Sequence, residues 1–198
     1  MIRSLFILSC VIAAGVGCSR STPTPDAAVL PAPPPSGTKT EFVEYVRWAK
    51  FKPGTTMVKR TITEEKGNPS KTIETTTSKL LELTADHAVV ETHLTGTRFD
   101  GVKMDTLPVT QKITRYFYLQ DNAKVDKADK AKSETVTVAG KSYQASVVSG
   151  KDRNEAGEVT STVWSSEEVP GGLLKSETLI QATGKLMTIE LIELKPAG

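Results

Sequence analysis

The chain has few of the residue types on which common protein chemistry depends. Its 198 residues include two histidines and two cysteines, Cys10 and Cys18. Because both cysteines precede residue 20, the rest of the chain cannot build a disulfide framework or a thiolate zinc cluster. The 25 basic and 23 acidic residues nearly balance, which argues against a nucleic-acid-binding surface. With 38% hydrophobic and 24% charged residues, the composition is that of a globular protein.

The amino-terminal segment is apolar but too short to cross a membrane. After the basic residue Arg3, the run from Leu5 to Val16 is apolar except for Ser9. A membrane-spanning helix needs about 20 residues, more than this run provides. A basic start, a short apolar stretch and small residues at its end are typical of a secretory signal.

The end of this segment reads Gly15-Val16-Gly17-Cys18 and resembles the lipobox of bacterial lipoproteins. In that family Leu is commonest where this chain has Gly15, so the match rests on the last three residues. The resemblance implies cleavage between Gly17 and Cys18, transfer of diacylglycerol to the Cys18 sulfur and, in many species, acylation of the new amino terminus. The alternative is an ordinary signal peptide with a chance cysteine, but no clear Ala-x-Ala site precedes another cut.

The acyl chains on Cys18 would hold the protein at a membrane. One chain alone anchors only reversibly, so two or three chains are needed for a durable attachment. Ser19 follows the cysteine, whereas in well-studied double-membrane bacteria an Asp at that position retains lipoproteins in the inner membrane. The resemblance therefore implies an outer-membrane address. We expect no cofactor beyond the covalent diacylglycerol and N-acyl chain on Cys18.

The first 37 residues divide into a signal peptide, 1–17, and a lipidated linker, 18–37. The linker holds six prolines, no aromatic residue and only Arg20 and Asp26 as charges. It therefore lacks the apolar surface needed to offset the entropy of ordering. Its prolines favour an extended spacer of up to about 60 Å at ~3.1 Å per residue. A PxxP ligand is the competing interpretation of Pro31–Pro34.

Residues 38–198 are predicted to form a β-rich domain. This region has 24 threonines and 15 valines, which favour pleated strands. Turn signals such as Pro170-Gly171-Gly172 separate its apolar runs, and short connections imply antiparallel neighbours. Strands are expected near 55–63, 71–83, 88–96, 109–119, 134–138, 141–150, 158–166, 173–181 and 185–194.

One amphipathic helix is predicted at the start of this domain. Thr38 and Glu41 fit a capping box, and Pro53-Gly54 ends the helical pattern. The apolar stripe of this helix consists of Phe42, Tyr45, Val46 and Ala49. We expect a curved antiparallel meander or half-barrel wrapped over the helix, with a two-sheet β-sandwich as the alternative. This arrangement is similar to the lipoprotein-carrier family of periplasmic half-barrels, which shelter acyl chains.

The remaining polar residues form no recognisable catalytic or metal-binding motif. His87 and His93 share one strand but stand about 20 Å apart at ~3.3 Å per residue, so they cannot share a metal, and we expect both to be exposed. Residues 152–157 begin like a calcium loop but lack required oxygen ligands, which favours a polar turn. The charged run 121–132 is predicted to be a solvated loop or a short surface helix. The larger aromatic residues are interpreted as core rather than as a ligand platform: Trp48, Phe51, Phe117, Tyr143 and Trp164.

These observations predict a non-enzymatic, lipid-anchored envelope protein that binds or scaffolds something outside the cytoplasm. The alternative is a carrier of a lipid or other apolar ligand in a cavity of the curved sheet. A hydrolase with a dispersed site is a third class, which would need His87 or His93 in a cleft. The expected partners are the membrane, through the anchor, and an apolar ligand or another envelope protein, but no nucleic acid.

Replacing the predicted anchor residue, Cys18→Ser, should abolish incorporation of labelled palmitate and release the domain from membranes, because the sulfur that accepts diacylglycerol is lost. Metabolic labelling followed by membrane fractionation measures both effects. Cys10→Ser is the matched control, since that residue lies in the predicted signal peptide and its loss should leave labelling unchanged. Continued labelling of the Cys18→Ser chain would contradict the anchoring prediction.

Overall fold

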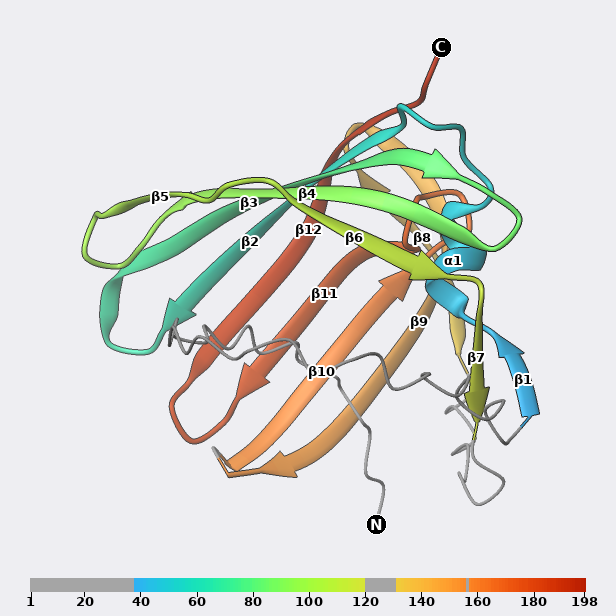
Figure 1. The fold of residues 1–198 in the computed structure, drawn as a ribbon. Helices are drawn as coiled ribbons and strands as arrows, with labels where there is room; N and C mark the ends of the chain where they lie inside the picture. The colour runs from blue at the N-terminus through green and yellow to red at the C-terminus, as the bar shows by residue number, and fades with distance from the viewer. Residues whose placement is uncertain (1–37, 120–130, 156) are drawn as a thin grey trace, which may run out of the picture.

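The computed structural model describes residues 38–119, 131–155 and 157–198. The predicted signal peptide, the linker with Gly17 and Cys18 at its start, and most of the charged run 121–132 lie outside these residues. The described residues form a ten-stranded antiparallel sheet, a separate two-stranded ribbon and one short helix (Figure 1). No helix among them is long and apolar enough to cross a membrane.

The main sheet is open, curved and built from two groups of consecutive strands (Figure 1). The first group is β2 (Thr56–Glu65), β3 (Asn68–Leu83) and β4 (His87–Thr97), and the second is β8 (Lys132–Val138), β9 (Lys141–Asn154), β10 (Gly157–Ser165), β11 (Leu173–Ile180) and β12 (Lys185–Lys195). Pairing of β12 with β2 joins the two groups. Two short strands, β5 (Lys103–Asp105) and β6 (Val109–Thr114), share the outer edge of β4.

The predicted curved antiparallel sheet is confirmed, and the β-sandwich alternative is not the fold that forms. Within each group, consecutive strands pair as a meander, as the short turn signals predicted. Strand β9 ends at Asn154 and strand β10 begins at Gly157, and these two residues pair. The calcium-loop-like sequence therefore belongs to a hairpin, as expected.

The predicted capping box is wrong, and the helix begins later than its pattern suggested. Helix α1 spans Val43–Trp48, and its N-cap residue Phe42 makes no side-chain capping bond. Thr38–Glu41 instead form strand β1, which pairs with β7 (Tyr116–Leu119). The strand ladder satisfies backbone groups along the whole segment, whereas a capping box would satisfy two N–H groups. Strand pairing therefore satisfies more of the backbone hydrogen-bonding groups of Thr38–Glu41 than a capping box would.

The predicted strand 109–119 is also wrong as a single element, because it divides at Arg115 into β6 and β7. The backbone N–H of Arg115 donates to the carbonyl of Asp86 at 2.7 Å, beside the main sheet. Its carbonyl accepts a hydrogen bond from the N–H of Phe42, also at 2.7 Å. Arg115 thus joins the sheet to the ribbon and redirects the chain between them.

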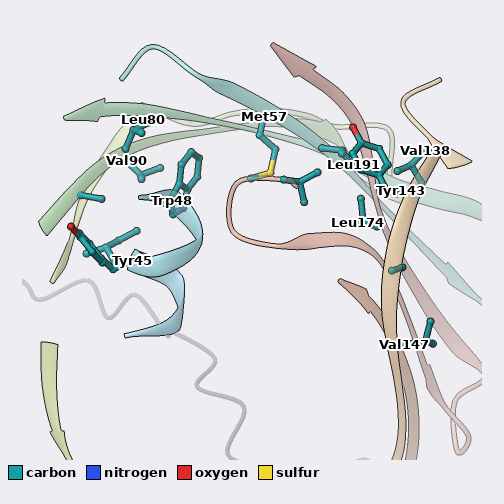
Figure 2. Packing of buried hydrophobic residues seen from close by; sticks show 14 residues of the cluster. Tyr45, Trp48, Met57, Leu80, Val90, Val138, Tyr143, Val147, Leu174 and Leu191 are labelled. Atoms are coloured by element: carbon teal, nitrogen blue, oxygen red, sulfur yellow. The ribbon is translucent and has the colours of Figure 1, made fainter. Parts of the chain in front are cut away.

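Helix α1 covers one part of the hydrophobic core, at one end of the sheet. Figure 2 shows Trp48 pointing from the helix toward Leu80 and Val90 and lying beside Met57. The buried cluster comprises Tyr45, Trp48, Met57, Leu80, Ala88, Val90, Ile113, Val138, Tyr143, Ala145, Val147, Val169, Leu174 and Leu191. This cluster draws on strands from both groups, so the core depends on their being joined.

The predicted apolar stripe of the helix is only partly correct. Tyr45 is buried as expected, but Phe42 is 38% exposed and Ala49 is exposed. Trp48, three residues after Tyr45, supplies the second buried side chain of α1, because positions three apart share a face of a helix. Among the other predicted core aromatics, Tyr143 is buried, Phe51 and Trp164 are partly buried, and Phe117 is exposed.

Leu80→Ala should lower the free energy of unfolding by about 2–5 kcal/mol, because it leaves a cavity in a fully buried position. Leu107→Ala is the matched control, since Leu107 is 86% exposed and its loss should change the free energy by less than about 0.5 kcal/mol. Urea unfolding of the chain lacking residues 1–18 measures both values. Equal effects of the two substitutions would contradict the placement of the core.

Candidate binding site on the helix-facing side of the sheet

The two sides of the curved sheet carry different side chains, and the side that α1 partly covers is the candidate site. Residues that pair directly across antiparallel strands lie on the same side of a sheet. Met57, which belongs to the buried cluster with Trp48, therefore identifies the helix-facing side of β2. Alternation along the strand places Lys59, Thr61 and Thr63 on this side as well.

Beyond the core, the helix-facing side is lined by hydroxyl and aliphatic side chains. The hydroxyl set, on β2, β3 and β4, is Thr61, Thr63, Thr72, Thr76, Ser78 and Thr92. The aliphatic set, on β10, β11 and β12, is Val159, Val163, Ile180, Met187 and Ile189. The aliphatic residues are half-buried, so part of their surface remains open to a ligand.

Charged residues are concentrated on the opposite side of the sheet. Arg60 pairs there with Glu190, with 3.5 Å between Nη2 and Oε2. A second ion pair, between Lys175 and Glu177, has an Nζ–Oε1 distance of 2.8 Å. On the helix-facing side, the residues of β2 from Met57 to Thr63 and their cross-strand partners include two charged residues, Lys59 and Glu74. At the far end of β9–β12, Asp152 and Lys185 also lie on the helix-facing side, beside Val159 and Ile180. The central part of the sheet therefore carries more charge on the opposite side than on the helix-facing side.

The two charged residues on the helix-facing side of the central strands are Lys59 of β2 and Glu74 of β3. Lys59 lies between Thr76 of β3 and Leu191 of β12, beneath α1. Burial lowers the pKa of Lys59 from 10.5 to about 8, against a smaller raising effect of Glu44 and with a further lowering by Arg47. The lowered pKa means that the charged form of Lys59 is disfavoured by its surroundings.

A cleft of about 270 Å³ lies beside α1, where the helix approaches the ends of β9 and β10. Its lining is mixed: Val43, Val46, Arg47, Lys50, Ser146, Ser165, Ser166 and Glu167. Lys50 and Glu167 form an ion pair at 2.6 Å. Arg47 donates a hydrogen bond to the carbonyl of Gly171 at 3.2 Å. The lining of the cleft therefore contains charged and hydroxyl groups beside its two valines.

Gly172 allows Arg47 to lie against the loop after β10. A side-chain carbon on Gly172 would stand 2.6 Å from Nε of Arg47, and the residue has a φ of +76°. Both features favour glycine at this position. Core side chains and Arg47 thus fill part of the space between α1 and the sheet, and the remaining cleft is lined by polar groups. An apolar ligand is better matched by the aliphatic set, which lies away from this cleft.

The two histidines lie on the opposite side of β4 and do not contribute to this surface. Nε2 of His93 stands 2.7 Å from Oδ1 of Asp105, and the side chain is exposed as expected. His87 was expected to be exposed, but its side chain is only 20% exposed because its ring contacts Thr84 and Glu82. No group of three or more possible metal ligands gathers within the described ranges.

Sequence reasoning missed Lys59 and the difference between the two sides of the sheet. Alternation from Met57 could have placed Lys59 on the apolar side of its strand, and that was the available signal. The aliphatic set could not be found in this way, because it depends on the pairing of distant strands. The predicted site residues Gly17 and Cys18 lie outside the described residues.

No family model and no curated protein matches the chain. Among solved structures, it is similar to a protein from Parabacteroides distasonis that is provisionally described as a lipoprotein, at 13% identity and a TM-score of 0.42 over 73% of this chain and 96% of that one.

Two further solved structures are similar to the chain. A provisionally described exported protein with a YmcC-like fold, from Bacteroides fragilis, shares 9% identity at a TM-score of 0.44, over 73% of this chain and 97% of that one. A provisionally described outer membrane lipoprotein-sorting domain from Vibrio parahaemolyticus shares 11% identity at a TM-score of 0.25, over 76% and 88%. All of these TM-scores are low, so the similarities do not establish a shared fold or function.

Lys59→Met should remove a pH-dependent contribution to stability. Below the folded-state pKa of about 8, Lys59 is protonated in both states and its burial is fully unfavourable. As the pH rises from there toward 10.5, the folded state loses the proton while the unfolded state keeps it. The free energy of unfolding of the natural chain should therefore rise relative to the variant, by on the order of 1–3 kcal/mol.

Urea unfolding of the chain lacking residues 1–18, over a series of pH values between neutral and alkaline, measures this difference. Lys79→Met is the matched control, because Lys79 is exposed and on the opposite side of the sheet. The free energy of unfolding of this control variant should change with pH in the same way as that of the natural chain. If the free energy of unfolding of the Lys59→Met variant also changes with pH as that of the natural chain does, the burial of the Lys59 amine is contradicted.

Proposed function

We propose that the protein is a lipid-anchored protein of the bacterial cell envelope that acts without catalysis, as a binding or scaffolding module. The helix-facing side of the curved sheet is the binding surface in this proposal. The lipobox-like residues that end at Cys18 and the proline-rich linker support the anchoring. Ser19 supports the outer membrane as its location.

The difference in charge between the two sides of the sheet is the observation that carries the binding proposal. A sheet whose two sides both faced only water would have no reason to carry so few charges on one side of its central part. Here the charged side holds the ion pairs of Arg60 and Lys175, while the other side is lined by the hydroxyl and aliphatic sets. A weakly polar, half-buried concave surface is the kind that buries a partner at low desolvation cost.

The aliphatic set favours a second candidate function, the carriage of a lipid or other apolar ligand. Ile180, Met187 and Ile189 lie on adjoining strands beyond α1 and are half-buried. Each methylene that such residues remove from water contributes about 0.8 kcal/mol, so a modest acyl chain could bind there. The hydroxyl set on the neighbouring strands makes the surface less apolar than a dedicated acyl cavity, which is why binding or scaffolding is the first proposal.

A photo-crosslinking amino acid placed at Thr76 should capture the partner in cells that produce the lipidated chain, because Thr76 is on the helix-facing side. The same amino acid at Thr77 is the matched control. Thr77 is the next residue, is also half-buried, and lies on the opposite side of β3. Mass spectrometry of the adducts identifies what is bound, and circular dichroism checks that both variants fold.

A protein adduct specific to position 76 supports the scaffolding function, and a lipid adduct specific to position 76 supports the carrier function. Equal adducts from both positions, or none from position 76, would contradict the assignment of the helix-facing side as a binding surface.

A further inference from the structure

The ribbon formed by β1 and β7 carries exposed aromatic and aliphatic side chains outside the main sheet. Strand β7 begins Tyr116-Phe117-Tyr118, and Phe42 and Val43 follow directly after β1. Phe117 is 37% exposed, Tyr118 is 43% exposed and Val43 is 59% exposed. Figure 1 shows the ribbon projecting from the amino-terminal end of α1, on the side of the molecule away from the carboxyl terminus.

Contacts within the ribbon hold these side chains in fixed positions. The rings of Phe42 and Phe117 meet edge to face with centroids 5.8 Å apart. The Nζ of Lys39 lies 3.8 Å above the ring of Tyr116. At the base of the ribbon, Nε of Arg115 donates to Oε1 of Glu41 at 2.8 Å. Alternation along β7 places Phe117 on one face of the ribbon and Tyr116 and Tyr118 on the other. The ribbon therefore carries aromatic side chains on both faces, and its outer end, at Thr38, is the part that can present both faces to a bilayer.

The position of the ribbon in the chain relates it to the predicted lipid anchor. Strand β1 begins at Thr38, immediately after the linker 18–37, and Thr38 pairs with Leu119 at the tip of the ribbon. The linker spans at most about 60 Å when extended at ~3.1 Å per residue. A tether of this length keeps the ribbon at an effective concentration on the order of millimolar with respect to the anchoring membrane. Even a weak affinity of the ribbon for lipid would then be sufficient for contact.

We propose that the β1–β7 ribbon is a membrane-contact surface, which rests on the lipid bilayer that holds the acyl chains of Cys18. Tyrosine side chains, which are amphipathic, concentrate at the headgroup level of bilayers, and phenylalanine rings add apolar surface beside them. The cationic Lys39, which lies on the same face as Tyr116 and Tyr118, suits a surface that contains anionic headgroups. The contact fixes the domain with the ribbon toward the bilayer and the carboxyl terminus away from it. This inference rests on the anchoring part of the proposed function.

The test uses the full, lipidated chain in vesicles of phosphatidylethanolamine and phosphatidylglycerol. Processing at Cys18 would remove Cys10 and acylate the other sulfur, so an introduced cysteine becomes the one free thiol. An environment-sensitive fluorophore on Thr38→Cys should shift its emission to shorter wavelength and be quenched by a headgroup-level lipid quencher. The same label on Gly198→Cys, at the opposite end of the molecule in Figure 1, should show neither change.

Removing the aromatic side chains should abolish the signal at position 38. Phe117→Ser with Tyr118→Ser should return the emission to that of the label in water, whereas Leu107→Ser should not, although Leu107 is 86% exposed. Circular dichroism checks the fold of these variants. The Thr38 label on the otherwise natural ribbon decides the question even if the double variant fails to fold.

The failure of this proposal is distinguishable from failure of the anchor. An acylated, vesicle-bound chain whose Thr38 label still reports water would overturn the membrane contact and leave the proposed function intact. A mature chain without acyl mass on Cys18 would instead overturn the anchoring, and with it the basis of this inference. Equal spectral shifts at positions 38 and 198 would also overturn it, because the contact would then have no defined side.

Discussion

The structure depends on the antiparallel pairing of β2 with β12. Thr56 at the start of β2 and Lys195 at the end of β12 lie side by side although almost the whole domain separates them in sequence. Closing so long a loop carries an entropic cost, which the ladder and the burial of Met57, Leu191 and their neighbours must offset. Without this pairing the two meanders would be separate hairpin stacks. Neither of them alone contains both the hydroxyl set and the aliphatic set, so the candidate binding surface would not exist.

The same pairing divides the sheet into a filled end and an open end. At the filled end, Trp48 and Tyr45 of α1 complete the core, and Arg47 closes against the loop that contains Gly171 and Gly172. The loop 166–172 also packs there through the buried residue Val169. Away from the helix and this loop, the aliphatic residues of β10, β11 and β12 are left half-buried. A longer helix would have covered more of the helix-facing side. The short length of α1 therefore leaves this side of the sheet open as a candidate binding surface. The ion pairs of Arg60 and Lys175 lie on the opposite side of the sheet.

Arg115 connects the main sheet, which carries the candidate binding surface, to the ribbon that follows the predicted linker. Its backbone bonds to Asp86 and Phe42, and its side chain bonds to Glu41, so sheet, helix start and ribbon are held at one residue. If the ribbon rests on a bilayer, this rigid junction sets the orientation of the whole sheet relative to the membrane. A flexible tether alone would leave that orientation free. An anchored binding module benefits from a defined orientation, because its partner then approaches from a predictable direction.

The sequence by itself determined the features that depend on neighbouring residues. Turn residues and β-branched strands predicted an antiparallel curved sheet, and the helical spacing of Phe42, Tyr45, Val46 and Ala49 predicted a helix, because both signals act over a few residues. The lipobox-like end at Cys18 is a local signal too, and it stays a prediction. Only the tertiary structure decided that Thr38–Glu41 form a strand rather than a capping box, that the chain divides at Arg115, and that β12 pairs with β2. Each of these outcomes depends on backbone partners far away in the chain, and a pattern read along the sequence does not identify those partners.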